Sequence, residues 1–396
     1  MRILLLSHNN VTPGSFFHDY LAGIEAAARE LGHEAQIFGY AHIGAVSAAE
    51  RDALYRLLAA SDIDAVIDPC CWGYALSQSR VWDGSGTGEA VFDSVDAACV
   101  GLLCDQPYYQ PLPGIHSGRL HAALPDRTHA EQIALLYPAL QLRSAPFVPP
   151  AARIENDRSL PWAERDIDVL YLGHLQLDAL ERPWRGSPEA ARCDALAERA
   201  LAAPDTPLHR VLLDMIREDA IDSDDAAPAM MTLWLQRVEY FVHARLRLDA
   251  VRAAAAAGVR MHVVGKGWNS IDWPATVSLQ EAVSYEDFFR LAGRSRTALD
   301  ASTYLNGAND RVFNFAVNRC LGITNARGYL GEAFADGGMR FYSMSRLDEL
   351  GALIGDALSR PGPLQEEMDA ARTEVLRSHT WRSRLSTILE SIRETT

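Results

Sequence analysis

The chain has 396 residues, which is too long for one ordinary hydrophobic core and fits two domains of about 150 to 200 residues each. A hydrophobic content of 48% excludes general disorder, and no apolar run approaches the roughly 20 residues that a transmembrane helix needs. The formal net charge of −15 argues against a nucleic-acid partner, because phosphate backbones are bound by clustered Lys and Arg. We therefore expect a cytoplasmic protein with at most peripheral membrane contact.

The cysteines give no sign of a metal site. None of the six has the spacing of a metal-binding motif, and the adjacent pair Cys70 and Cys71 cannot chelate an ion as a Cys-x-x-Cys motif does. Buried, reduced thiols are the simpler interpretation. We expect no bound metal and no cofactor.

Strand and helix patterns alternate along the first 155 residues. Residues 2–7 form an apolar strand, 18–31 an amphipathic helix and 34–40 a second strand, which together predict a β-α-β unit. A helix at 48–60, strands at 65–68 and 99–104 and a strand after Tyr137 continue the alternation. The pattern predicts a Rossmann-like domain over residues 1–155.

Three titratable residues of this domain are candidates for a catalytic base. Asp105 follows directly on the strand 99–104, where a carboxylate is placed either for catalysis or for capping the loop. His8 lies at the end of the opening strand and His18 at the start of the first helix. A lone histidine in such a place is more often solvated than catalytic, so the residues alone leave the choice open.

A second Rossmann-like domain is predicted over residues 165–378, with a helical insertion of unknown role at about 176–240. Its apolar opening strand ends at Gly173 and His174. A later strand, 260–264, leads into Gly265-Lys266-Gly267, which contains the only lysine of the chain. Glycines on both sides let the backbone approach a ligand, and the alternative is a solvated lysine in a turn.

Two successive strand-loop-helix units follow between residues 297 and 345. Polar loops at 306–310 and 325–328 come after the short strands 297–299 and 323–324. Because the carboxyl ends of parallel strands lie at one edge of a sheet, we expect the two loops to meet there and to bind a ligand. Helix N-termini at that edge favour an anion such as a pyrophosphate.

This stretch resembles the donor half of GT-B glycosyltransferases, and within them the spore maturation protein B-like subgroup. The matching positions are Arg311, Phe313, Ala316, Gly322, Phe334, Gly337 and Tyr342. The His379-Thr380-Trp381 sequence resembles the usual tail of the family. The resemblance implies an α/β fold of two Rossmann-like domains facing each other across a cleft, with the last helix, 379–394, returning to the first domain.

The resemblance also implies an activity: transfer of a sugar from a nucleotide-sugar donor to a hydroxyl of a glycan, protein or small molecule, without metal. Asp105 matches an Asp-x-Pro-Tyr element of the family, which favours it as the catalytic residue over His8 and His18. The implied donor-binding residues are Gly173, His174, Lys266, Asn306, Asp310, Arg311, Asn314 and Asn325.

One position departs from the family. Relatives carry Glu after the conserved Phe, where it holds ribose hydroxyls, and this chain has Asn314. Asparagine cannot supply the charge-assisted hydrogen bond of a carboxylate, so donor binding is expected to change or weaken. Two alternatives therefore stay open: a non-catalytic protein that binds a sugar nucleotide or a partner, and a nucleotide-sugar epimerase. The sequence does not decide between retention and inversion.

Overall fold

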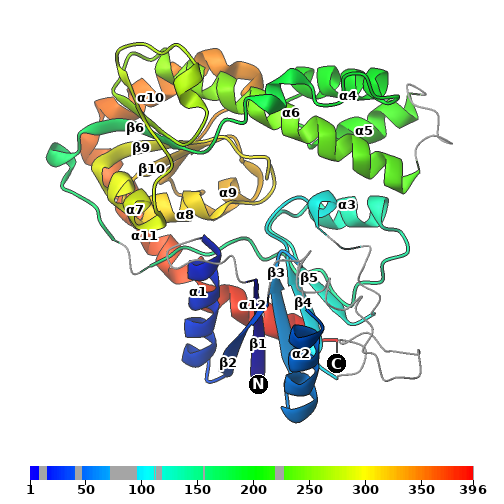
Figure 1. The fold of residues 1–396 in the computed structure, drawn as a ribbon. Helices are drawn as coiled ribbons and strands as arrows, with labels where there is room; N and C mark the ends of the chain where they lie inside the picture. Colours follow the sequence, from blue (N-terminus) through cyan, green and yellow to red (C-terminus); the bar gives the residue numbers. More distant parts are fainter. Residues whose placement is uncertain are drawn as a thin grey trace. The chain divides into compact units, whose positions relative to one another are not determined.

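The computed structural model describes residues 1–8, 16–40, 47–71, 96–110, 112, 118–154, 157–218 and 227–395. The chain divides into two compact units, Met1–Pro150 with Trp381–Thr396 and Ala151–Thr380 (Figure 1). The sequence predicts domains at 1–155 and 165–378 and a linker that runs from about residue 150 to residue 164. In the structure the second unit begins at Ala151 and therefore includes this linker.

The first unit is built on a parallel sheet with the strand order β2-β1-β3-β4-β5. Its strands are β1 (Arg2–His8), β2 (Glu34–Tyr40), β3 (Ala65–Pro69), β4 (Ala98–Leu102) and β5 (Leu120–Ala123). Its helices are α1 (Phe16–Glu30), α2 (Ala48–Ala60), α3 (His129–Leu136) and α12 (Trp381–Arg393). Leu4, Val66 and Leu120 are fully buried in the core of this unit.

Helix α12 packs on α1 within this unit. The rings of Tyr20 and Trp381 meet edge to face at 4.2 Å between centroids. Gly23 makes the contact possible, because a Cβ at this position would lie 2.2 Å from Cδ1 of Trp381. The last helix is therefore fixed by an aromatic pair that needs a glycine beneath it.

The strand expected after Tyr137 is absent from this part of the structure. Only isolated bridges join Ser144 to His121 and Phe147 to Leu124, because prolines interrupt the segment. The fifth strand is instead β5, four buried residues that come before α3.

The second unit has a parallel sheet with the order β11-β10-β9-β6-β7-β8. Its strands are β6 (Ile167–Leu172), β7 (Met261–Val264), β8 (Val277–Gln280), β9 (Ser295–Asp300), β10 (Leu321–Thr324) and β11 (Met339–Phe341). Its helices are α4 (Ala190–Ala202), α5 (Leu208–Arg217), α6 (Pro228–Ala255), α7 (Tyr285–Arg294), α8 (Asp310–Val317), α9 (Gly328–Ala333), α10 (Leu350–Ser359) and α11 (Pro361–Ser378).

The inserted helices α4 and α5 pack against the long helix α6 (Figure 1). Two buried tryptophans hold them: Trp184 donates to Asp194 and Trp234 donates to Glu189, each at 2.9 Å. The last turns of α6 lie in the main core of the unit, where Val251 is fully buried. Helix α6 thus joins the insertion to the sheet. None of the helices in the described ranges is long and apolar enough to span a bilayer.

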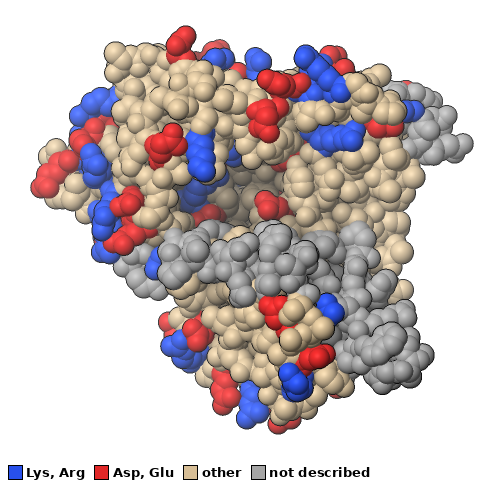
Figure 2. Space-filling view, viewed as in Figure 1, with Lys and Arg blue, Asp and Glu red and all other residues tan. Residues whose placement is uncertain are grey.

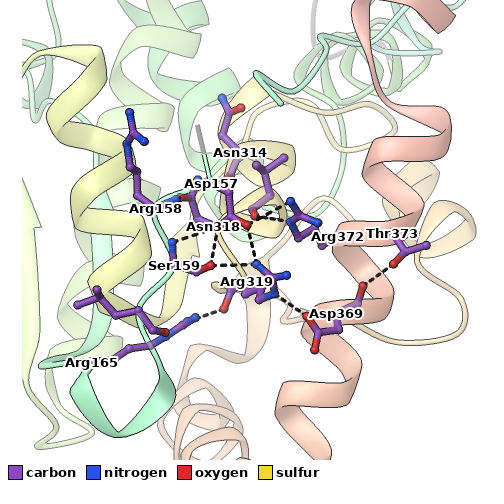
Figure 3. A network of polar contacts seen from close by, with 12 residues as sticks. Asp157, Arg158, Ser159, Arg165, Asn314, Asn318, Arg319, Asp369, Arg372 and Thr373 are labelled. Atoms are coloured by element: carbon purple, nitrogen blue, oxygen red, sulfur yellow. Dashed lines mark hydrogen bonds and ion pairs between the residues drawn. The ribbon is translucent and has the colours of Figure 1, made fainter. Parts of the chain in front are cut away.

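A polar network ties the linker to α8 and α11 (Figure 3). Asp157 accepts from Arg319 at 2.7 Å and pairs with Arg372 at 3.1 Å, while Arg319 also pairs with Asp369. Arg165 donates to the carbonyl oxygen of Ser295 at 2.8 Å. These contacts explain why the linker residues belong to the second unit.

Candidate functional site

The polar residues of the second unit gather at the carboxyl ends of β6, β7, β9 and β10, where open α/β sheets bind ligands. The loops that form this edge are 173–176 after β6, 265–267 after β7, 301–309 after β9 and 325–327 after β10. We call this set of loops the carboxyl edge.

Close backbone packing shapes the loops after β6 and β7. Gly265 has a φ of 140°, and a Cβ there would lie 2.3 Å from the carbonyl oxygen of Gly173. The backbone N–H of Lys266 donates to Nδ1 of His174 at 3.0 Å. The glycines therefore allow the two loops to pack closely. The backbone of Lys266 is fixed by its hydrogen bond to His174, and the Lys266 side chain is exposed to solvent.

Asp300 is the centre of the polar contacts at the end of β9. Its carboxylate is 2% exposed, accepts from Thr324 and Asn309 at 2.9 Å each, and lies 3.5 Å from Nη2 of Arg311. Arg311 also donates to the carbonyl oxygen of Leu172. The positive charge of Arg311 is thus partly neutralised within the protein.

Two of the predicted donor-binding asparagines lie in loops of the carboxyl edge. Asn325 accepts from the backbone N–H of Ser302 at 2.7 Å and donates to the carbonyl oxygen of the same residue at 2.9 Å. Asn306 lies in a turn packed on the start of α9, where Gly328 donates to the carbonyl oxygen of Leu305 at 3.1 Å. Asn325 therefore fixes the shape of the carboxyl edge by joining the loop after β10 to the loop after β9.

Asn314 is fully buried and its amide is engaged inside the protein. Its oxygen accepts from the backbone N–H of Arg153 at 2.9 Å, and its nitrogen donates to Tyr285 Oη at 2.8 Å and to Asp310 at 3.2 Å. Burial raises the pKa of Asp310, although the hydrogen bond from Tyr285 opposes this effect. The ribose contact expected for Asn314 stays a prediction, and the contacts give the residue a structural role.

The cations of the carboxyl edge surround His174. Burial lowers the pKa of His174, and the nearby charges of Lys266, Arg247 and Arg311 lower it further, while the carboxylate of Glu281 opposes them in part. The histidine is therefore neutral near pH 7 and lies among three cations. Such an arrangement favours an anion.

Arg247 and His243, both on α6, were not predicted from the sequence. Nη1 of Arg247 donates to the carbonyl oxygen of His174 at 2.6 Å, and Nη2 lies 2.8 Å from Nε2 of His243. Their only signal in the sequence is the spacing of four residues, which places them on one helix face. The position of that face at the carboxyl edge depends on the tertiary structure.

The first unit holds the candidates for the base. Asp105 follows β4, and its carboxyl is at the surface, yet the surrounding protein desolvates it and raises its pKa to about 6. The His18 side chain is exposed on α1, and its Nδ1 lies 3.5 Å from Oδ1 of Asp19. His8 ends β1, and its side chain lies outside the described part of the structure. Among the described residues, no group of three or more His, Cys, Asp or Glu side chains is arranged to hold a metal ion.

Comparison with known proteins agrees with this architecture. Residues 245–390 match the family model described as glycosyl transferase-like, and no curated protein matches the chain significantly. A glycosyltransferase from Rickettsia africae has 11% identity and a TM-score of 0.56, with 100% of this chain and 98% of the other covered. The chain has the GT-B fold of glycosyltransferases.

Two further solved structures are equally similar to this GT-B chain. Anabaena Alr3699/HepE in complex with UDP-glucose has 10% identity and a TM-score of 0.56, with 100% of each chain covered. A DNA-modifying β-glucosyltransferase, solved with and without UDP-glucose, has 10% identity and a TM-score of 0.56, with 99% and 100% covered. The predicted α/β fold with two Rossmann-like sheets is confirmed. The spore maturation protein B-like subgroup stays a prediction.

Proposed function

We propose that this protein is a glycosyltransferase whose second unit binds a nucleotide-sugar donor at the carboxyl edge. One observation carries the proposal: at the ligand-binding edge of the sheet, Arg247 and the backbone of Lys266 both donate to His174, and Arg311 lies beside Gly173. The glycosyl transferase-like match covers most of this edge. A nucleotide sugar needs such a cationic site for its diphosphate.

The proposed role of the cations is to stabilise the leaving diphosphate. Negative charge develops on it as the glycosidic bond breaks, and fixed positive groups stabilise that charge more in the transition state than in the ground state. Lys266 has no carboxylate partner among the described residues and is exposed, so its ammonium is available to a ligand. We propose that these side chains act without a metal ion.

For an inverting transfer, we propose Asp105 as the base that accepts the proton of the acceptor hydroxyl. A carboxylate with a pKa of about 6 is deprotonated near pH 7 and more basic than an ordinary aspartate. A retaining transfer needs no such base, so an Asp105 variant with full activity would count against this role.

We propose a glycan, protein or small molecule as the acceptor. The net charge of −15 disfavours nucleic acid. Figure 2 also shows acidic and basic side chains interspersed on the visible face. Because a DNA-modifying glucosyltransferase shares the fold, duplex DNA belongs in the acceptor test.

A thermal-shift panel of UDP-, GDP-, dTDP- and CMP-sugars tests the function, with UDP-glucose first because a structural neighbour was solved with it. We expect one nucleotide class to raise the Tm. We also expect the protein to release the free nucleotide slowly from that donor when no acceptor is present. A Tm shift without product would favour the non-catalytic binding protein, and a product sugar still attached to nucleotide would favour an epimerase. No shift with any of the four classes would contradict the proposal.

A further inference from the structure

We infer that Arg247 on α6 binds the diphosphate of the donor and that His243, one turn earlier, positions it. This inference rests on the proposed function and adds a role for the helix that carries the insertion. The family resemblance gave no residue from this helix, and the glycosyl transferase-like match begins only at residue 245.

The first argument is the balance of charge among the three cations. Arg311 lies beside the buried carboxylate of Asp300, which offsets its charge. Arg247 has no carboxylate partner among the described residues: its contacts are a carbonyl oxygen and an imidazole nitrogen, both neutral. A half-buried guanidinium without a counter-ion is unfavourable in a free protein and is stabilised when an anion binds.

The second argument is an unused donor. Nε of Arg247 is buried and has no hydrogen-bond partner, whereas Nη1 and Nη2 are engaged. An unpaired buried N–H costs about 1 to 3 kcal/mol, so most such groups in proteins are paired. A phosphate oxygen that reached Nε would satisfy this donor, while the two terminal nitrogens keep the guanidinium in place.

The third argument is the state of His243. Burial lowers its pKa well below 6.5, and the neighbouring charges of Arg247 and Arg311 lower it further. The neutral ring accepts from Arg247 through Nε2, so its proton is on Nδ1, which lies 3.7 Å from Glu239. The backbone of Ala301, in the loop after β9, is close enough to the ring to oppose part of this lowering of the pKa. His243 therefore fixes Arg247 relative to the carboxyl edge.

The test for Arg247 compares binding of inorganic pyrophosphate, UDP and uridine by titration calorimetry. Arg247→Ala should weaken pyrophosphate and UDP binding at least tenfold and leave uridine binding unchanged. Arg245→Ala is the matched control, because Arg245 is exposed on the same helix and pairs with Asp249 at 2.9 Å. It should bind all three compounds as the wild type does.

The test for His243 uses two substitutions. His243→Phe keeps a ring but removes the acceptor for Arg247, and should weaken UDP binding. His243→Gln restores an acceptor oxygen and should recover most of the affinity. A purely structural histidine would instead lower the Tm in both variants without this difference in affinity.

The outcomes separate the inference from the proposed function. Unchanged UDP and pyrophosphate affinity in folded Arg247→Ala, with weaker binding in Lys266→Ala, would overturn the inference and leave the donor site in place. Failure of the wild type to bind any nucleoside diphosphate or pyrophosphate would overturn both.

Discussion

The backbone N–H of Arg153 donates to the side-chain oxygen of Asn314 over 2.9 Å. One helical turn later, Asn318 accepts from the backbone N–H of Arg158 at 2.8 Å, so α8 and the residue after it hold two points of the linker (Figure 3). Where the resemblance implies a carboxylate for the ribose, this chain has an amide that binds its own backbone. The amide also donates to Tyr285 and Asp310, which a carboxylate cannot do.

Asn314→Asp should destabilise the protein by about 1 to 3 kcal/mol near pH 7. It removes the donor to Tyr285 and places a second carboxylate beside Asp310, whose oxygen lies 3.2 Å from the amide nitrogen. Burial and like charge raise the pKa of the new carboxyl, so the loss of stability should shrink as the pH falls and the pair takes up a proton. Urea unfolding of the wild type and the variant at pH 7 and at pH 5 measures this change in the free energy of unfolding.

Asn314→Glu, the family residue, gives the opposing test at the same position. We expect the Asn314→Glu protein to be less stable than the wild type as well. The longer carboxylate has no N–H to donate to Tyr285 or Asp310, and the position is fully buried. Unchanged stability together with tighter binding of a ribonucleotide donor would contradict this expectation, and would show that residue 314 reaches the ribose as the resemblance implies.

Asp105→Asn should remove the acidic limb of the pH–rate profile if transfer is inverting. Desolvation raises the pKa of Asp105 to about 6, so kcat/KM of the wild type should rise with pH through about 6, as the carboxylate forms, and then level off. The amide cannot accept the proton and should reduce kcat strongly at every pH, with donor affinity unchanged. A full rate in Asp105→Asn would exclude this residue as the base.

Lys266→Ala and Arg311→Ala should differ in stability although both weaken donor binding. Lys266 is exposed, so its removal should cost about 1.5 kcal/mol of donor affinity with little change in the Tm. Arg311→Ala should also lose about 1 to 3 kcal/mol of unfolding free energy, because it leaves the buried Asp300 without its cation. Calorimetric binding and urea unfolding of the same samples separate the two effects, and equal Tm values for both variants would contradict the role given to Asp300.

The architecture was accessible from the sequence because it depends on local patterns. Apolar runs such as Ile167–Leu172, followed by glycine and helix signals, predict the alternation of a doubly wound sheet. The prediction of a strand in the proline-interrupted segment after Tyr137 was wrong, since this segment forms only two isolated bridges, at Ser144 and Phe147.

The contacts of the site were less accessible, because they join residues far apart in the chain. Asn314 looked like a ligand residue by its place in a motif, yet its partner Arg153 is 161 residues away. Arg247 and His243 lie on a helix with no recognisable motif, and only the packing of α6 on the sheet brings them to His174. Periodicity predicts which face of a helix is buried but not which loop that face meets.

Asp157→Asn should lower stability in a pH-dependent way that reports on the linker network. Burial alone would raise the pKa of Asp157, but hydrogen bonds from Ser159 and Arg319 outweigh it, and the pKa is below its ordinary value. A carboxyl with a lowered pKa stabilises the fold above the pKa of the unfolded chain, about 3.9, and this contribution is lost as the pH falls through the folded value. We expect Asp157→Asn to cost about 1 kcal/mol from pH 5 to pH 8, a modest figure because the carboxylate is 30% exposed.

The difference between wild type and Asp157→Asn should then shrink as the pH falls below about 3.9 and through the lowered folded-state pKa of Asp157, because protonation leaves both side chains neutral. Asp348→Asn is the control, because Asp348 is exposed and has no ion-pair partner among the described residues, so its unfolding free energy should follow the wild type throughout. Urea unfolding across the pH range gives both curves. If the loss stayed constant while the side chain took up its proton, Asp157 would act through its shape and its neutral hydrogen bonds, and the charges of Arg319 and Arg372 would add nothing to the attachment of the linker.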